Sequence, residues 1–219
     1  MNASTAAVTE LATPSGMAGV SPPRAQVRAG PVLIRHLGMS PSVHPEAYVA
    51  PTAVLSGQVS VGCVIMENAV LRGTPRHRLL IGDRVLAGPH AQLTGCTVAD
   101  EVFIAAGAMV CNGAHLGRAA AVAPGAVVHF GAIVAPAARI PAGWVAVGDP
   151  ARPYPPGQAE AIRAGLAEAG WSFLPLVFGV DDAGGRRDQL RAALARYTAA
   201  MARHHLQDQV IAACQADGP

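Results

Sequence analysis

The hydrophobic positions of the chain recur about every six residues over residues 49–73 and again over residues 81–145. The units from Ile81 onward read IGDRVL, AGPHAQ, LTGCT, VADEVF, IAAGAM, VCNGAH, LGRAAA, VAPGAV, VHFGAI, VAPAAR and IPAGWV. Each unit opens with an aliphatic residue or Ala, usually continues with Gly or Ala, and carries a small residue or Val at its fifth position. An upstream block repeats the pattern as VAPTAV, LSGQVS, the shortened VGCV, IMENAV and LRG.

This period predicts a solenoid. Each unit can form one short strand and a corner, with its leading aliphatic residue pointing inward, and three units then make one triangular coil. Stacked coils pair each strand with the strand in the next coil and bury a continuous apolar ladder. A β-sandwich would need period-two polarity and turn signals every 8–12 residues, which the chain lacks. We therefore predict an all-β solenoid, a parallel β-helix of hexapeptide repeats over residues 32–149.

The segments on either side of the repeats differ in composition. Residues 1–31 are small, polar and interrupted by Pro and Gly, without a basic and apolar leader, and we predict a disordered extension. Residues 150–219 are predicted as a linker followed by C-terminal α-helices. Four prolines stop the repeat there, because proline donates no backbone hydrogen bond and its ring restrains the chain: Pro150, Pro153, Pro155 and Pro156.

The C-terminal segment shows helical spacing. Residues 157–169 are predicted to be helical, and residues 171–180 form an apolar connector. Farther on, apolar residues recur three and four positions apart, with arginines opposite. We expect this stripe to pack along the solenoid or against a neighbouring subunit. Its members are Leu190, Leu194, Tyr197 and Met201.

Composition and charge exclude several classes of protein. Hydrophobic residues make up 51% of the chain, but no uninterrupted apolar run reaches the 18 or so residues that a membrane span needs. The formal charge of +2 provides no basic footprint for nucleic acid. Cysteines 63, 96, 111 and 214 form no CxxC pair and come with no secretory context, so neither a disulfide framework nor a CxxC zinc site is expected. These features favour a cytoplasmic protein that contacts neither membrane nor nucleic acid.

Three motifs in a fixed order resemble the start of γ-class carbonic anhydrases: SVHPEAYVAPTAVLSGQVSVG, AVLRG and LLIG. The ending RIPAGWVAVGDPARP is similar to the isoleucine-patch terminus that many hexapeptide acyltransferases share. The resemblance covers residues 32–156 or so. It implies a left-handed β-helix and a cyclic homotrimer in which zinc lies between subunits, bound by three histidines.

The positions of those three histidines are occupied by other residues in this chain. With every hexad kept in step, the resemblance places the ligands at Thr94, Ala106 and Cys111. Supporting positions differ too, because Thr74 stands where the family has Asp and Gly88-Pro89 where it has Gln-Asp. Metal ligands need such partners to hold them in place. We therefore expect that none of the family ligands is kept, and that no cofactor is bound in the usual way.

Other residues stand in the column where the family has its zinc ligands. Thr94, Cys111 and His129 share the second hexad position in successive coils, where the family's ligands stand. Cys111 and His129 are the candidate catalytic residues, because a thiolate and an imidazole can bind zinc or act as nucleophile and base. The alternative for Cys111 is a small buried apolar residue. Sliding the alignment by one coil matches His129 to the third ligand but puts Pro124 at the second.

Other residues are candidates for substrate binding or for the subunit interface. Arg72, Arg76 and Arg78 form a basic patch that can hold a carboxylate or phosphate bidentately, or make ion pairs between subunits. Three histidines lie where they can reach a neighbouring chain, although each alone is a satisfied or surface residue in the simpler interpretation: His77, His90 and His115. Four others are interpreted as packing or solvent-facing residues: His36, His44, His204 and His205.

Three functions follow from these features. The first is a γ-carbonic-anhydrase-like homotrimer without standard CO2 hydratase activity, repurposed for binding a small molecule, for assembly or for another reaction at the subunit interface. The second is a zinc-dependent lyase of the carbonic anhydrase type with a rearranged ligand set. The third is a CoA-dependent acyltransferase. Zinc bound to such a rearranged site would support the second function, and its absence from folded protein would support the first.

Overall fold

The computed structural model describes residues 30–170, 173–181 and 184–211. The predicted N-terminal extension falls almost wholly outside the described residues, as does Cys214. Within the described part, no helix is both long and apolar enough to cross a membrane.

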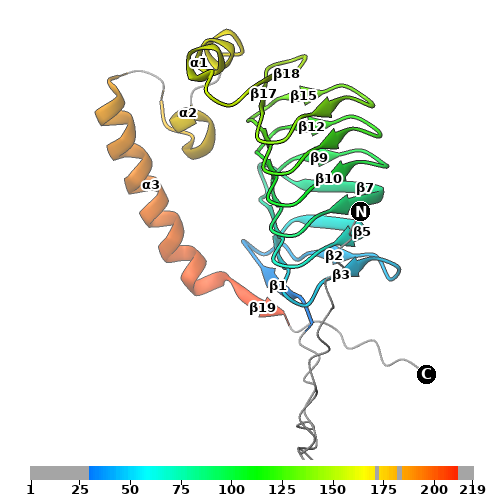
Figure 1. Ribbon diagram of the computed structural model, residues 1–219. Coiled ribbons are helices and arrows are strands. Elements are labelled where there is room, and N and C mark those ends of the chain that lie inside the picture. Colours follow the sequence, from blue (N-terminus) through cyan, green and yellow to red (C-terminus); the bar gives the residue numbers. More distant parts are fainter. Residues whose placement is uncertain (1–29, 171–172, 182–183, 212–219) are drawn as a thin grey trace, which may run out of the picture.

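The chain folds as a left-handed parallel β-helix with C-terminal α-helices, as the repeats and the family resemblance predicted (Figure 1). Most strands are only two to four residues long, since each hexad supplies a short strand and then a corner. The strands are β1 (Val32–Arg35), β2 (Ser42–Val43), β3 (Tyr48–Val49), β4 (Val54–Gly57), β5 (Val59–Ile65), β6 (Val70–Gly73), β7 (Leu79–Ala87), β8 (Gln92–Thr94), β9 (Thr97–Val98), β10 (Phe103–Ile104), β11 (Met109–Val110), β12 (His115–Leu116), β13 (Ala121–Val122), β14 (Val127–Val128), β15 (Ile133–Val134), β16 (Arg139–Ile140), β17 (Val145–Val147), β18 (Arg152–Tyr154) and β19 (Gln209–Ile211).

The strands form two sheets. The first, called sheet A, has the order β18-β17-β14-β11-β8-β6-β4-β1-β19. The second, called sheet C, covers the other two sides of the prism, with β7 joined to β5, β9 and β10. The two sheets enclose a single apolar core.

The core is built from the leading aliphatic residues of the hexads. In sheet A, Leu55 pairs with Leu71, Leu71 with Leu93, Leu93 with Val110 and Val110 with Val128. All five side chains are fully buried. Burying an aliphatic side chain of this size stabilises the folded state by about 1.5–3 kcal/mol. The ladder therefore depends on contacts between neighbouring coils, as is usual in repeat proteins.

Irregular units change the strand register without breaking the stack. Val110 pairs with Val128, eighteen residues later, whereas Leu93 pairs with Val110, only seventeen residues later, because LTGCT is one residue short. The pairing of β5 with β7 shifts twice around Gly62, where the shortened VGCV lies against the full unit IGDRVL. The length differences are absorbed at corners, so the inward positions stay in line.

The C-terminal segment leaves the stack and returns to its first coil. The strand β18 pairs antiparallel with β17 and ends the solenoid. Three helices follow: α1 (Ala159–Glu168), within the range predicted to be helical, α2 (Phe173–Phe178), inside the segment interpreted as a connector, and α3 (Arg186–Gln207). Figure 1 shows α3 running beside the solenoid from the β18 end to the β1 end. There β19, which the sequence pattern did not predict, pairs antiparallel with β1.

The apolar stripe of α3 remains largely exposed in the single chain. Leu190, Leu194 and Tyr197 are 46%, 56% and 44% exposed, and only Ala193 of this helix is buried among its described side chains. The stripe therefore does not pack closely along the solenoid of its own chain. Packing against a neighbouring subunit stays a prediction.

His36 anchors the returning segment. Its side chain is 2% exposed, and Nδ1 lies 3.0 Å from the Asp208 carboxylate, which immediately precedes β19. The interpretation of His36 as a packing residue therefore fits its burial, with a hydrogen bond to Asp208 added. The pair joins two parts of the chain 172 residues apart.

Candidate functional site

The predicted column of Thr94, Cys111 and His129 exists on sheet A. Arg72 pairs with Thr94, and Cys111 and His129 directly follow the paired residues Val110 and Val128. The Cys111 amide donates to the Val128 carbonyl at 3.0 Å, and the His129 amide donates to Ala146 at 2.9 Å. Because side chains alternate along a strand, these residues lie opposite the inward ladder. We call Arg72, Thr94, Cys111 and His129 the outer column.

Cys111 is a buried, protonated thiol. Its side chain is 7% exposed, and burial raises its pKa to about 11. Cys96, in the adjoining coil, has a raised pKa as well, because of its own burial and then because of Cys111. A thiol of this kind holds little thiolate at neutral pH and is a weak nucleophile and a weak metal ligand.

His129 is a neutral imidazole with an unused nitrogen. Burial lowers its pKa, since desolvation disfavours the charged form. Its Nδ1 is inaccessible to solvent and has no hydrogen-bond partner among the described residues. The ring lies edge-on to Phe130, with the centroids 4.9 Å apart. His129 is thus ready to donate or accept a hydrogen bond in the neutral state.

A loop brings His77 to the same place. The turn is closed by the Thr74 amide donating to the His77 carbonyl at 2.8 Å and by the His77 amide donating to Thr74 Oγ1 at 3.1 Å. A Cβ on Gly95 would lie 2.4 Å from the His77 Cβ and 2.8 Å from Asn112 Oδ1, so only glycine fits between them. Gly95 follows Thr94 and Asn112 follows Cys111. His77 therefore lies beside the outer column.

The His77 imidazole, like that of His129, is neutral and has a nitrogen without a hydrogen-bond partner among the described residues. Burial, and then the positive charge of Arg76, lower its pKa. Its Nε2 is inaccessible to solvent and has no hydrogen-bond partner in the described part of the chain. Two neutral imidazoles thus accompany one guanidinium, that of Arg72, along this side of sheet A.

The remaining predicted site residues lie apart from the column. His90 is exposed at the corner before β8, and His115 is exposed on β12 of sheet C. Ala106 is exposed in the corner before β11. Arg76 is exposed in the loop that carries His77, as is Arg78. The structure places Arg72, Cys111 and His129 along one column of successive coils, with His77 beside its middle at Gly95 and Asn112, and does not place His90 or His115 with them in one chain.

The positions that the resemblance assigns to the zinc ligands carry no imidazole in this chain. Thr94 and Ala106 offer no imidazole, and the thiol of Cys111 is protonated at neutral pH. Within one chain, and among the residues that the structure describes, no three His, Cys, Asp or Glu side chains lie close enough together to hold a metal ion.

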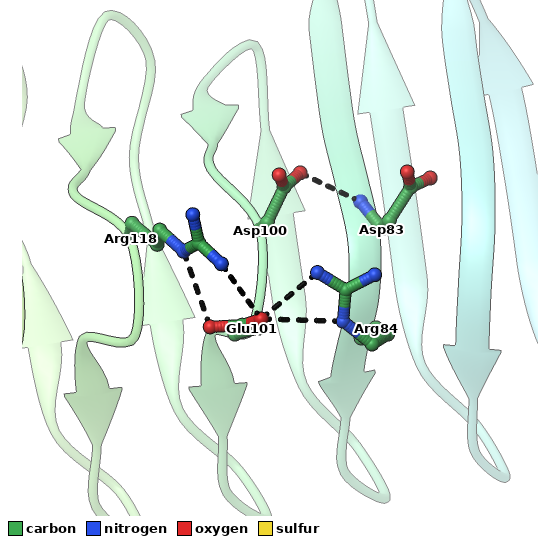
Figure 2. Close-up of polar contacts among 5 residues, drawn as sticks. All are labelled: Asp83, Arg84, Asp100, Glu101 and Arg118. Carbon is green, nitrogen blue, oxygen red and sulfur yellow. Dashed lines mark hydrogen bonds and ion pairs between the residues drawn. The ribbon is translucent and has the colours of Figure 1, made fainter.

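A row of charged side chains at a corner of sheet C was not predicted from the sequence (Figure 2). Glu101 accepts hydrogen bonds from Arg84 at 2.8 Å and from Arg118 at 2.9 Å, one coil to either side. These bonds lower the pKa of Glu101 to about 2. The Asp83 amide donates to Asp100 Oδ1 at 2.9 Å. Arg84, Glu101 and Arg118 are spaced 17 residues apart, which is one coil, and this spacing was the signal in the sequence. The exposed contacts link neighbouring coils and lie away from the outer column.

No family model matches the chain. It is 33% identical over 161 residues to gamma carbonic anhydrase 1, mitochondrial, of Arabidopsis thaliana, a match that covers 59% of this chain and 55% of the relative. The chain thus spans about half the length of the curated relative that it matches.

Two solved structures were among the structural matches. A variant of perosamine N-acetyltransferase from Caulobacter crescentus, in complex with CoA and GDP-perosamine, is 24% identical, with 53% of this chain and 57% of that chain covered and a TM-score of 0.42. A putative acetyltransferase from Bacillus cereus is 19% identical, with 82% and 99% covered and a TM-score of 0.36. From its repeats, its fold and its sequence relative, the chain is a hexapeptide-repeat left-handed β-helix that is similar to γ-class carbonic anhydrases.

Proposed function

We propose that the chain is a γ-carbonic-anhydrase-like homotrimer that lacks the three-histidine zinc site and uses the outer column to bind a small molecule at the subunit interface. The proposal depends on the residues that occupy the three inferred ligand positions. They are Thr94, Ala106 and Cys111, whose buried thiol is protonated at neutral pH. Standard CO2 hydration needs a metal-activated water, which these residues cannot support.

An apolar row on sheet A supports the trimer. Along the strand register the row runs Val54, Val70, Gln92, Met109 and Val127, beside the outer column, and it is apolar except for Gln92. Val70 is 42% exposed and Met109 36% exposed in the single chain. Cyclic assembly would bury this row in a closed interface and avoid open-ended association. The outer column would then lie at that interface.

The side chains of the outer column, together with His77 beside it, suit a polar ligand that is uncharged or anionic. Arg72 provides a guanidinium, and His77 and His129 provide neutral imidazoles with unused buried nitrogens. A buried polar atom without a partner is costly, and a ligand that supplies the missing hydrogen bonds removes that cost. Binding, rather than nucleophilic attack by Cys111, is therefore the favoured role.

The decisive experiment measures zinc, activity and mass on the same purified full-length protein. We expect a trimer by light scattering, far less than one zinc per subunit by elemental analysis, and no CO2 hydration above background in stopped flow. Stoichiometric zinc in folded protein would contradict the proposal and favour a rearranged zinc-dependent lyase. A monomer would contradict the interface. Binding of CoA in calorimetry would favour the acyltransferase alternative.

A gain-of-function variant tests the ligand alignment independently. The triple substitution Thr94→His, Ala106→His and Cys111→His places imidazoles at all three inferred positions. We expect this variant to bind zinc as a trimer, while Thr94→His alone does not. If the triple variant folds as a trimer and binds no more zinc than the wild type, the assignment of these positions is wrong.

A further inference from the structure

Two arginines from distant parts of the chain meet where α2 ends. Arg76 belongs to the loop after β6, and Arg196 belongs to α3. A Cβ built on Gly179 would lie 3.1 Å from Nη1 of Arg76 and 3.4 Å from Nη1 of Arg196, so these two nitrogens are no more than 6.5 Å apart. Arg196 also donates a hydrogen bond to the Gly179 carbonyl. The backbone of Gly179 has φ +65°, a conformation that favours glycine.

Neither arginine is neutralised by a carboxylate in the described structure. The arginines that form ion pairs there are others: Arg84, Arg118, Arg152, Arg163 and Arg191. Arg203, two helical turns after Arg196, is likewise outside every one of these pairs. Three guanidinium groups without counter-charges therefore gather on one part of the surface. Guanidinium groups bind phosphate oxygens in a bidentate geometry.

A cavity with aromatic lining adjoins this cluster: Arg196 and Arg203 line it, and Arg76 lies outside the lining, next to Arg196 at Gly179. The cavity has a volume of about 380 Å³ and is lined by Phe178, Arg196, Tyr197, Ala199, Ala200 and Arg203. The rings of Phe178 and Tyr197 pack edge to face, with centroids 5.6 Å apart, so Phe178 of α2 braces the ring of Tyr197 on α3. The lining of the cavity thus combines two guanidinium groups with two aromatic rings. Aromatic side chains in this position can stack on a planar ring.

We propose that the cavity between α2 and α3 binds a nucleotide, with Arg76, Arg196 and Arg203 holding its phosphates and the Phe178–Tyr197 pair contacting its base. Three guanidinium groups match the charge of a diphosphate better than that of a single carboxylate. The aromatic lining favours a ligand with a planar ring over inorganic phosphate. This site is separate from the outer column and does not depend on the function proposed for it, although Arg76 is the chain neighbour of His77.

Calorimetry of the full-length protein with ADP at low salt tests the proposal. We expect ADP to bind, and Arg76→Gln and Arg196→Gln each to weaken binding at least tenfold. Arg203→Gln should also weaken it, and this variant keeps the Arg196 contact to Gly179 intact. Arg163→Gln is the matched control, because Arg163 is an exposed arginine on α1 that pairs with Glu160. It should bind ADP like the wild type.

A second probe separates the phosphate contacts from the ring contact. Inorganic pyrophosphate should bind more weakly than ADP, and Tyr197→Ala should weaken ADP but not pyrophosphate. Circular dichroism confirms that each variant is folded. The proposal is overturned if the wild type does not bind ADP at millimolar concentration, if Arg163→Gln weakens binding as much as Arg76→Gln, or if Tyr197→Ala leaves the preference for ADP unchanged.

Discussion

The state of Cys111 decides whether the outer column can act as a nucleophile or only as a binding surface. Burial raises the pKa of its thiol from the ordinary 9.0 to about 11. At about pH 8, a thiol with the ordinary value is roughly one-tenth thiolate, whereas Cys111 would be about one-thousandth thiolate. Because the thiolate is the reactive species, ionisation alone slows alkylation of Cys111 about a hundredfold, and its 7% exposure slows it further.

The assay is alkylation by iodoacetamide, followed over time by mass spectrometry of the Cys111 peptide. The same protein in concentrated urea gives the rate for an ordinary, exposed thiol. Cys63 serves as an internal control, because burial raises its pKa to about 12 and it should react more slowly than Cys111. Assembly into a trimer would bury Cys111 further and change the rate in the same direction.

The reasoning fails if native Cys111 is alkylated within about tenfold of its rate in urea. A fast rate would show a thiolate in the column, and the role of Cys111 as nucleophile or metal ligand would then return. A slow rate that becomes fast in Thr94→Ala would locate the source of the burial in the neighbouring coil.

Three further predictions test the packing and the charged contacts. Leu79→Ala should cost about 2–5 kcal/mol of unfolding free energy and Leu80→Ala less than about 1, because Leu79 is fully buried and Leu80 is 43% exposed; equal losses in urea denaturation would contradict the alternation along β7. Glu101 has a lowered folded-state pKa of about 2 against 4.5, so wild-type stability should fall as pH falls from 4.5 toward 2, and Glu101→Gln should flatten that part of the melting profile. Asp208→Asn should weaken docking of β19 by about 1–3 kcal/mol and speed amide exchange at 209–211, with no change in the middle coils.

Much of the solenoid could be predicted from the sequence, because its contacts repeat at a short, regular spacing. The six-residue period identifies the inward positions, and the unit lengths place Thr94, Cys111 and His129 in one column. Even the irregular units were informative, since the missing residue of LTGCT appears as a coil of seventeen residues between Leu93 and Val110. The handedness came from the family resemblance and not from the period.

The position of His77 depended on the tertiary structure. The loop that carries it follows no repeat, and its path is set by the turn at Thr74 and by the space above Gly95. His90 and His115 looked equally suitable from sequence, but His90 lies exposed at the corner before β8 and His115 lies on β12 of sheet C.

The sequence by itself determined the stacked coils, their inward ladder and the alignment of Thr94, Cys111 and His129, because each of these depends on residues about one coil apart. The structure added Arg72 to that column. Only the tertiary structure decided which distant segments meet: β19 with β1, His36 with Asp208, and Arg76 with Arg196. Such contacts form when the chain after the last coil folds back along the solenoid, and their spacing in the sequence follows from the length of α3 and its turns rather than from any repeat. The physical reason is that periodic contacts are encoded locally, whereas a contact between remote segments depends on the whole path between them.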